Sequence, residues 1–258
     1  GSHVTHEYAT DRRVALELQR IAGPSEMHYS LVTDSTQTSV KSLLDAGAKP
    51  PVVVVTEEQT AGRGRLDRVW SAPPFSSVLM SVGLPVLEQR GFFTLQVGVV
   101  IARALAASGG EARLKWPNDI VMLAGERVRK LGGVLAEVHG EHVVVGIGLN
   151  IDMVDDELPT PDAISCRQLG VVPRREQLID DIVQGLVGLP HRLVMDDYRA
   201  LCATLGAEVR ITRIVGEPLQ GKAISVDDDG ALVVQDSSGV EHRATVGDVQ
   251  HVRPGSPA

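Results

Sequence analysis

The run PVVVVTEEQ at residues 51–59 constrains the fold more than any other feature, because its β-branched apolar residues suit a strand covered on both faces. The segment at 94–110 is apolar nearly all round and ends at Gly-Gly, which predicts a helix packed deeply against the sheet. The other strand-like runs are grouped between few helices rather than alternating with them, which predicts an α+β domain with a mixed or antiparallel sheet. Those runs lie at 77–84, 112–116, 130–138 and 142–150.

Three further segments have helical periodicity. Residues 11–21 form a short helix at most. Residues 33–47 predict a helix that begins near Ser35 or Thr36, whose hydroxyls suit the N-cap position. Residues 173–206 carry apolar side chains at helical spacing. The side chains expected to face inward there are Leu178, Ile179, Ile182, Val183 and Leu186.

The hydrophobic pattern of the sequence changes after Gly206. Short alternating runs separated by the turn signals DDDG and SSG predict a small all-β barrel. We therefore expect an N-terminal tail with a short helix at 1–25, a catalytic domain at 26–205 and a C-terminal β-barrel at 206–258. The opening GSH resembles the remnant of a cleaved expression tag.

Composition limits the classes of function. Of the 258 residues, 43% are hydrophobic, yet no apolar run has the length of a membrane-spanning helix, and no secretion signal is evident. The formal net charge of -8 and the aromatic content of 3% argue against a nucleic-acid-binding protein. Cys166 and Cys202 have no metal-ligand spacing, which favours a reducing compartment. These features predict a soluble cytoplasmic protein that binds neither DNA nor membranes.

The buried run at 51–59 leads directly into GRGRLDRVW, residues 62–70. Glycines leave the backbone N–H groups accessible, and several guanidiniums suit phosphate oxygens approached from more than one side. The chain lacks the common GxGxxG and GxxxxGK[ST] nucleotide fingerprints, so the mode of phosphate binding must differ from theirs. The alternative is a solvated turn whose arginines balance Glu57, Glu58 and Asp67.

Two later motifs favour the phosphate interpretation. In KWPNDI, Pro117 fixes a turn that presents Asn118 and Asp119 at the edge of the sheet. A carboxylate beside an anion-binding loop is repulsive unless a divalent metal lies between them, and Mg²⁺ with nucleotide phosphates fits that arrangement. In RKLGGV, Lys130 precedes two glycines that leave room for a ligand. The alternatives are an ordinary turn and a β-bulge.

Four blocks in one order resemble the bacterial biotin–protein ligases. They are GRGRLDRVW, which matches the GRGRxxRxW signature of that family, KWPND, KLGGVLAEV and GIGLN, and together they cover roughly residues 30–150. The C-terminal segment resembles the family's SH3-like barrel more loosely. The resemblance implies a class II synthetase-like catalytic core of the monofunctional type, without an N-terminal DNA-binding domain. It also implies activation of biotin by MgATP to biotinyl-5'-AMP, followed by transfer to a lysine of a biotin carboxyl carrier protein domain of acyl-CoA carboxylases.

The resemblance implies roles for particular residues. The catalytic set is Lys130, Arg63, Arg68 and Asp119. The biotin-binding set is Ser35, Thr36, Gln59, Gly62, Arg63, Arg65, Lys130 and Gly132. The set for ATP and the adenylate is Arg63, Arg65, Arg68, Trp70, Asn118, Lys130 and Asn150. Asp119 is the expected ligand of Mg²⁺, which accompanies ATP, and no tightly bound organic cofactor is expected.

The sequence departs from the family pattern in two places. Gln37 stands where the family commonly has asparagine in STN, and Gly132 stands where it more often has alanine in KLAG. The choice of Lys130 over Arg127 or Arg129 rests on the alignment of a hairpin that is longer than in some relatives.

Three other functions compete with the ligase interpretation. A lipoate or octanoate ligase-like enzyme shares the broad fold but lacks the GRGRxxRxW loop. A non-catalytic sensor of biotinyl-adenylate would not need Lys130 and Asp119. A nucleic-acid regulator is disfavoured by the net charge and by the short N-terminal segment, which has no space for a three-helix DNA-reading module.

Overall fold

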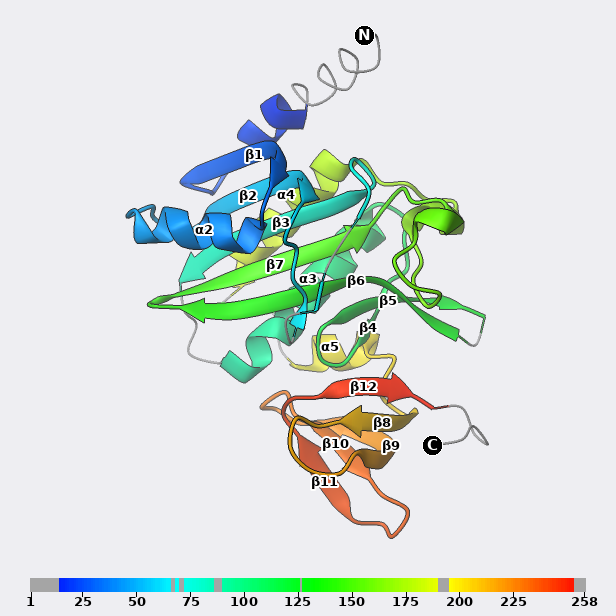
Figure 1. Cartoon of the computed structure of the whole chain (residues 1–258). Helices are drawn as coiled ribbons and strands as arrows, with labels where there is room; N and C mark the ends of the chain where they lie inside the picture. Colours follow the sequence, from blue (N-terminus) through cyan, green and yellow to red (C-terminus); the bar gives the residue numbers. More distant parts are fainter. Residues whose placement is uncertain are drawn as a thin grey trace.

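The computed structural model describes residues 14–65, 68–69, 72–85, 90–125, 127–189 and 195–252, and the side chains of residues 90 and 91 are not described. These residues form a seven-stranded sheet and, beyond it along the chain, a separate five-stranded sheet (Figure 1). The larger sheet has the order β1-β2-β3-β7-β6-β5-β4, and β1 and β2 are its one parallel pair among the described strands. The predicted mixed α+β sheet is therefore confirmed. Its strands are β1 (Glu26–Thr33), β2 (Val52–Gln59), β3 (Ser77–Pro85), β4 (Arg113–Lys115), β5 (Asp119–Ala124), β6 (Arg127–His139) and β7 (His142–Asn150).

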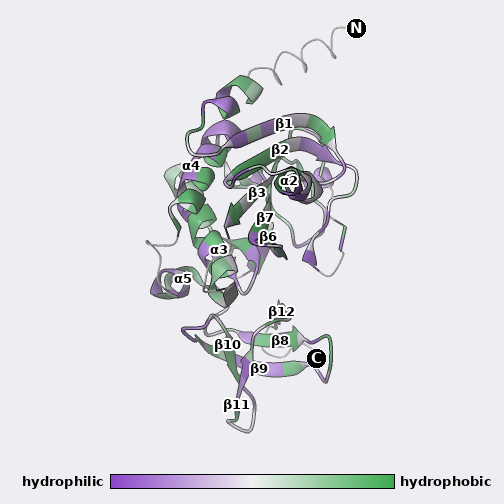
Figure 2. Ribbon diagram, turned by 90° about the vertical axis from the view of Figure 1, so that its left-hand side faces the viewer, coloured by the Kyte–Doolittle hydropathy of each residue, from purple (hydrophilic) through white to green (hydrophobic). Residues whose placement is uncertain are grey.

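The strand β2 is buried on both faces, as its composition predicts. Val53 and Val55 belong to the main hydrophobic core, whereas Val52 and Val54 pack in a second cluster with the helix α2 (Thr36–Asp45). Alternate residues of a strand point to opposite faces, so α2 covers one face of the sheet and the main core lies on the other. Figure 2 shows α2 on one side of the sheet and α3, α4 and α5 on the opposite side.

The helices α3 (Arg90–Ala107), α4 (Arg175–Val187) and α5 (Met195–Leu201) cover the main core, and the helix at residues 14–19 adds Val14 and Leu18 to it. The inward-facing side chains predicted for the helical segment after Pro173 are all buried in α4: Leu178, Ile179, Ile182, Val183 and Leu186. Within the predicted helix at 11–21, the described residues 14–19 are helical, with Val14 and Leu18 buried. Within the described part of the chain, no helix has the length and apolar character needed to cross a membrane.

The edge strand β1 is absent from the sequence-based expectations. Its sequence, EMHYSLVT, mixes exposed and half-buried positions without regular alternation. It forms by parallel pairing with β2, in register from Glu26 opposite Val52 to Thr33 opposite Gln59. An edge strand is covered less fully than a central one, so its hydrophobic pattern is weaker and easily missed.

The smaller sheet is antiparallel throughout, in the order β11-β10-β9-β8-β12, and agrees with the short strands expected after Gly206. Its strands are β8 (Glu208–Thr212), β9 (Leu219–Val226), β10 (Leu232–Gln235), β11 (Glu241–Ala244) and β12 (Asp248–His251). Trp116 joins the two sheets: its buried indole donates a hydrogen bond to the carbonyl of Gly230 at 2.9 Å. Its backbone N–H donates to the hydroxyl of Thr204 at 3.0 Å.

Candidate active site

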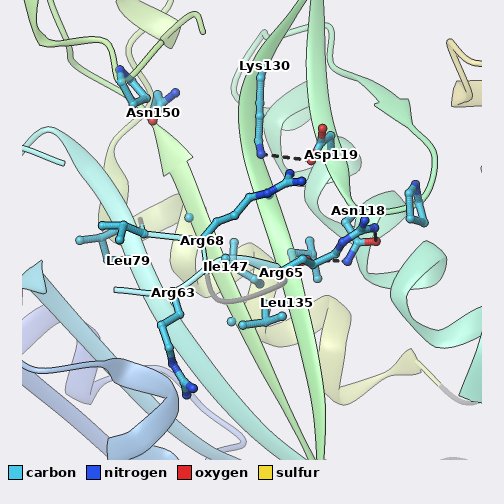
Figure 3. Close-up of a pocket in the computed structure, with 18 of the residues that line it drawn as sticks. Arg63, Arg65, Arg68, Leu79, Asn118, Asp119, Lys130, Leu135, Ile147 and Asn150 are labelled. Carbon is cyan, nitrogen blue, oxygen red and sulfur yellow. Dashed lines mark hydrogen bonds and ion pairs between the residues drawn. The ribbon is translucent and has the colours of Figure 1, made fainter. Parts of the chain in front are cut away.

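A cavity of about 390 Å³ opens on the face of the larger sheet that carries α2. Its walls come from the N-terminus of α2, the segment after β2, β3, the β4–β5 turn, β6, β7 and β12. Figure 3 shows some of the side chains that line it. Ten residues with predicted roles line it together: Ser35, Thr36, Gln59, Arg63, Arg65, Arg68, Asn118, Asp119, Lys130 and Asn150. Segments far apart in the sequence therefore converge on one pocket.

One part of the cavity is apolar and floored by the sheet. Leu79 of β3 and Leu135 of β6 line it on either side of β7, while Ile147 of β7 lines it but belongs to the main core on the other face. Gly146 and Gly148 also line it, and a Cβ on Gly146 would lie 2.9 Å from Oε1 of Gln37, so this glycine lets the Gln37 side chain pack against β7. Such a surface suits the apolar body of a ligand.

A hydroxyl and amide cluster lies beside this apolar wall. The side-chain oxygen Oε1 of Gln59 accepts a hydrogen bond from the backbone N–H of Thr36 at 2.9 Å and lies 3.2 Å from its hydroxyl. The Thr36 hydroxyl also lies 2.7 Å from that of Ser81. Ser35 occupies the N-cap position of α2, yet its side chain makes no capping hydrogen bond. Its hydroxyl is therefore not committed to helix capping.

Lys130 extends into the cavity from β6, with its Nζ 3.2 Å from Oδ1 of Asp119 (Figure 3). The other two basic residues of the hairpin lie elsewhere: Arg127 pairs with Asp162 at the surface, and Arg129 donates to the carbonyl of Ala163. The register of β6 against β5 shifts between Ile120 and Val121, so a bulge lies beside Lys130. Of the three hairpin cations, Lys130 is the one that lines the cavity.

The motif at residues 62–70, here named the Gly/Arg loop, has three arginines whose guanidiniums face hydrogen-bond acceptors and carboxylates from other segments. Arg65 donates to Oδ1 of Asn118 at 3.0 Å and to Oδ1 of Asp248 at 2.8 Å. Arg68 donates to the other carboxylate oxygen of Asp248. Arg63 lies 3.9 Å from the carboxylate of Glu137 on β6. The loop thus presents three guanidiniums to the cavity while carboxylates offset part of their charge.

Lys115 lines the cavity, and His251 lies outside the lining but close enough to interact with the charges of Lys115 and Asp119; the sequence analysis assigns neither a role. Burial lowers the pKa of Lys115, an effect that the nearby Asp119 charge partly offsets. Burial, aided by the charge of Lys115, lowers the pKa of His251 to about 4. The signal for Lys115 is its place in KWPND, since it pairs across the β4–β5 ladder with Asp119. His251 carries no comparable signal.

Two buried acceptors in the cavity wall have no partner among the described residues. They are Oδ1 of Asn150 and Oε1 of Gln37. The rest of each amide is fixed, because Asn150 donates to the carbonyl of Ile164 at 3.1 Å and Gln37 donates to Glu137 at 3.0 Å. A buried acceptor without a partner is costly, so these oxygens are suited to accept hydrogen bonds from a ligand.

Two described residues with predicted roles are not among those that line the cavity, and a third residue with a predicted role is not described. Gly62 and Gly132 lie outside the lining, and Trp70 lies outside the described residues. A Cβ on Gly132 would lie 2.1 Å from the carbonyl oxygen of Gly148, so this glycine serves the close approach of β6 and β7. Its neighbour Gly133 lines the cavity instead.

Among the described residues, two carboxylates line the cavity, those of Asp119 and Asp248. In the described part of the chain, no three residues of the types His, Cys, Asp and Glu gather as a metal-binding group. Both cysteines are buried and free, and burial raises the pKa of Cys166 to about 11. Carboxylate oxygens are ligands that Mg²⁺ accepts, so Asp119 and Asp248 are the residues of the wall that could contact such an ion.

Two family models match the chain. The Biotin/lipoate A/B protein ligase family matches residues 29–152, and the Biotin protein ligase C terminal domain matches residues 204–252. A biotin--[acetyl-CoA-carboxylase] ligase of Mycobacterium tuberculosis is 34% identical over 237 residues, which cover 86% of this chain and 87% of that protein. The chain belongs to the biotin protein ligase family.

Other members of the ligase family extend the likeness. The bifunctional ligase/repressor BirA of Bacillus subtilis is 28% identical over 238 residues, covering 83% of this chain and 70% of that one. A biotin protein ligase from Aquifex aeolicus, solved in complex with biotin and ATP, superposes with a TM-score of 0.71. The superposition covers 89% of this chain and 99% of the Aquifex aeolicus chain at 20% sequence identity, and this similarity shows the fold.

Proposed function

We propose that this protein is an ATP-dependent biotin–protein ligase that forms biotinyl-5'-AMP and then transfers biotin to a lysine of a carrier protein. The observation that carries the proposal is the meeting of Lys130, Arg65 and Arg68 with an apolar, hydroxyl-lined recess in a single cavity. Biotin has an apolar body, a polar ureido edge and a carboxylate, and the recess offers complements to all three. The match with the biotin protein ligase C-terminal domain favours biotin over lipoate or octanoate as the substrate.

The first step joins two anions. A carboxylate oxygen of biotin attacks the α-phosphorus of ATP, the bond from that phosphorus to the β-phosphate breaks, and pyrophosphate leaves with the electron pair. Fixed positive charge at the meeting point lowers the barrier, because it stabilises charge that builds up there. Lys130 is proposed to contact both the carboxylate and the α-phosphate, a role supported by its side chain, which extends into the cavity.

The second step transfers the biotinyl group. The neutral amine of a carrier lysine attacks the acyl carbon, the bond to AMP breaks and the amine gives up a proton. The mixed anhydride hydrolyses in water, so a site that excludes solvent protects it. We infer that Arg63, Arg65 and Arg68 hold the phosphates, while Ser35, Thr36 and Gln59 contact the ureido edge.

The substrate nucleotide is MgATP. Asp119 is proposed to contact the ion, because it lines the cavity beside Lys130, whereas both carboxylate oxygens of Asp248 accept hydrogen bonds from arginines. Asn118 and Asn150 are proposed to contact the nucleotide. The proposed acceptor is a biotin carboxyl carrier domain of an acyl-CoA carboxylase, modified in the cytoplasm.

The test is exchange of labelled pyrophosphate into ATP, measured with biotin, lipoate and octanoate as alternative acids. Biotin should trigger exchange at least a hundredfold faster than the other two acids. Exchange driven by lipoate or octanoate would assign the protein to the lipoate ligase-like enzymes. Tight binding of biotin and ATP without exchange would identify a sensor.

A further inference from the structure

Asp248, the first residue of β12, joins the smaller sheet to the Gly/Arg loop. Its Oδ1 accepts a hydrogen bond from Arg65 at 2.8 Å, and its Oδ2 accepts one from Arg68. The carboxylate lines the cavity and its side chain is 28% exposed. One anion of the C-terminal part of the chain therefore contacts two cations of a loop that lies more than 170 residues earlier.

Arg65 is fixed more firmly than Arg68. Its guanidinium also donates to the carbonyl of Gly247 at 2.9 Å and to Asn118 at 3.0 Å. Three of its five N–H donors are thus used by acceptors from β12, its preceding residue and the β4–β5 turn. The side chain of Arg65 is 23% exposed, whereas that of Arg68 is 62% exposed. A long flexible side chain held at three points has lost most of its rotamer freedom before any ligand arrives.

The loop itself supplies little support of this kind. Within its described residues, its backbone is closed by hydrogen bonds from Gly64 N–H to the carbonyl of Arg68 at 2.6 Å and from Arg68 N–H to the carbonyl of Arg65 at 3.2 Å, and by an isolated bridge between Arg63 and Val69. By contrast, β12 is well anchored, because it pairs with β8 over four residues and Val249 is buried in the main core. The strand β12 therefore fixes the positions of the two arginines, because its own position does not depend on them.

We propose that Asp248 is a positioning residue for the nucleotide end of the site: it holds Arg65 and Arg68 in the orientation in which they receive the phosphates of ATP. This inference rests on the proposed function. It assigns to the smaller sheet a direct part in preparing the adenylation site. Because Asp248 acts on Arg65 and Arg68, the effect falls more on ATP than on biotin. Arg65 also belongs to the biotin-binding set implied by the resemblance, but the proposed ureido contacts at Ser35, Thr36 and Gln59 lie on other elements.

The alternative role for the same contact is inhibition. A carboxylate that binds two phosphate-binding arginines also competes with phosphate for them. Removing a competitor would lower the KM for ATP, whereas removing a positioning group would raise it. The neutral partners of Arg65, Asn118 and Gly247, favour positioning, because they do not repel a phosphate.

The test compares Asp248→Ala and Asp248→Asn with the wild-type protein in biotin-dependent ATP–pyrophosphate exchange. We expect the KM for ATP to rise about tenfold in Asp248→Ala and about threefold in Asp248→Asn, which retains an acceptor. The KM for biotin should stay within twofold. Direct calorimetric binding of ATP should weaken by the same factors, and thermal unfolding reports whether each variant is folded. If Asp248→Ala does not fold, Asp248→Asn decides the outcome.

Asp228 provides a matched control. It lies between β9 and β10 and forms an ion pair with Arg199 of the helix α5 at 2.9 Å, but it does not line the cavity. Asp228→Ala should leave the KM for ATP unchanged. The inference is overturned if Asp248→Ala equals Asp228→Ala, or if its KM for ATP falls.

A double-mutant cycle separates positioning from general disruption. In an Arg65→Ala background, Asp248→Ala should raise the KM for ATP by less than threefold, because the residue that it positions is gone. An unchanged tenfold effect there would reject the proposal. If the wild-type protein itself shows no biotin-dependent exchange, the proposed function fails, and calorimetric binding of ATP still decides the role of Asp248.

Discussion

The ammonium of Lys130 and the carboxylate of Asp119 lie 3.2 Å apart, on the neighbouring strands β6 and β5, at the wall of the cavity. Replacing Lys130 by alanine removes the positive charge proposed to lie between the two reacting anions. We expect the rate of pyrophosphate exchange to fall by about a hundredfold or more. Arg127→Ala removes a cation of the same hairpin that pairs with Asp162 outside the cavity, so it should exchange at the wild-type rate. Equal rates in the two variants would remove Lys130 from the proposed chemistry.

The glycines 132 and 133 face different surroundings, and alanine substitutions should distinguish them. A Cβ on Gly132 meets the backbone of Gly148, which can yield only by moving β7, so Gly132→Ala should lower the free energy of unfolding by about 1–3 kcal/mol. A Cβ on Gly133 meets Lys130 atoms at the ordinary contact distance of 3.6 Å, so Gly133→Ala should be nearly neutral in stability. Urea unfolding measures both, and equal losses would contradict the assigned roles.

Glu57 is a buried carboxylate in β2, and Arg175 at the start of α4 donates to both of its oxygens. Tyr29 on β1 donates a third hydrogen bond to it at 2.7 Å. Arg175→Met leaves this carboxylate uncompensated, so the free energy of unfolding should fall by about 3–5 kcal/mol. The neighbouring Arg174 pairs with Glu17 at the surface, and Arg174→Met should cost less than about 1 kcal/mol. Chemical denaturation checks both values, and a similar loss in the two variants would argue against the buried pair.

The free energy of unfolding should depend on pH because of the lowered pKa of His251. Burial, with a smaller contribution from the Lys115 charge, lowers its pKa from 6.5 to about 4 in the folded protein. Between these values the unfolded chain binds more protons, so stability rises with pH in this window and is lost as the pH falls from about 6.5 to about 4. The contribution is at most about 3 kcal/mol, and it is smaller in practice because solvent reaches part of the ring.

Replacing His251 by glutamine removes the titrating group and keeps a polar side chain. The difference in unfolding free energy between wild type and His251→Gln should therefore change with pH between about 4 and 6.5 and stay constant above pH 7.5. Thermal unfolding at a series of pH values measures it. A difference that is constant across the whole range would show that the ring does not titrate in this way.

Local patterns were sufficient to predict most of the fold. The run at 51–59 predicts a strand buried on both faces, and Val52 to Val55 alternate between two hydrophobic clusters as it requires. The strand β1 was missed, because its residues pair at an edge and carry no clear alternation. Its formation depends on a neighbour already in place, which a local pattern does not record.

The residues that line the cavity can be predicted where they belong to a continuous sequence motif. The motifs GRGRLDRVW, KWPND and KLGGV place their cations and amides together in the wall. Asp248 and His251 were not predictable in the same way, because their roles arise when the second sheet packs against the first. Gly132 shows a further limit, since the sequence indicates an open backbone position but not whether a ligand or another strand occupies it.

The edge strand β4 is covered by the chain that leads into the smaller sheet. The backbone of Ala203 donates to the carbonyl of Leu114 at 2.8 Å, and Cys202 forms a parallel bridge with Leu114. During synthesis, β4 emerges from the ribosome long before these residues. Its outer edge then stays open to pairing with other nascent chains, a condition that favours aggregation. Shortened chains that end before residue 202 would keep that edge open permanently, so solubility in the cell should depend on a segment that contributes no strand to the larger sheet.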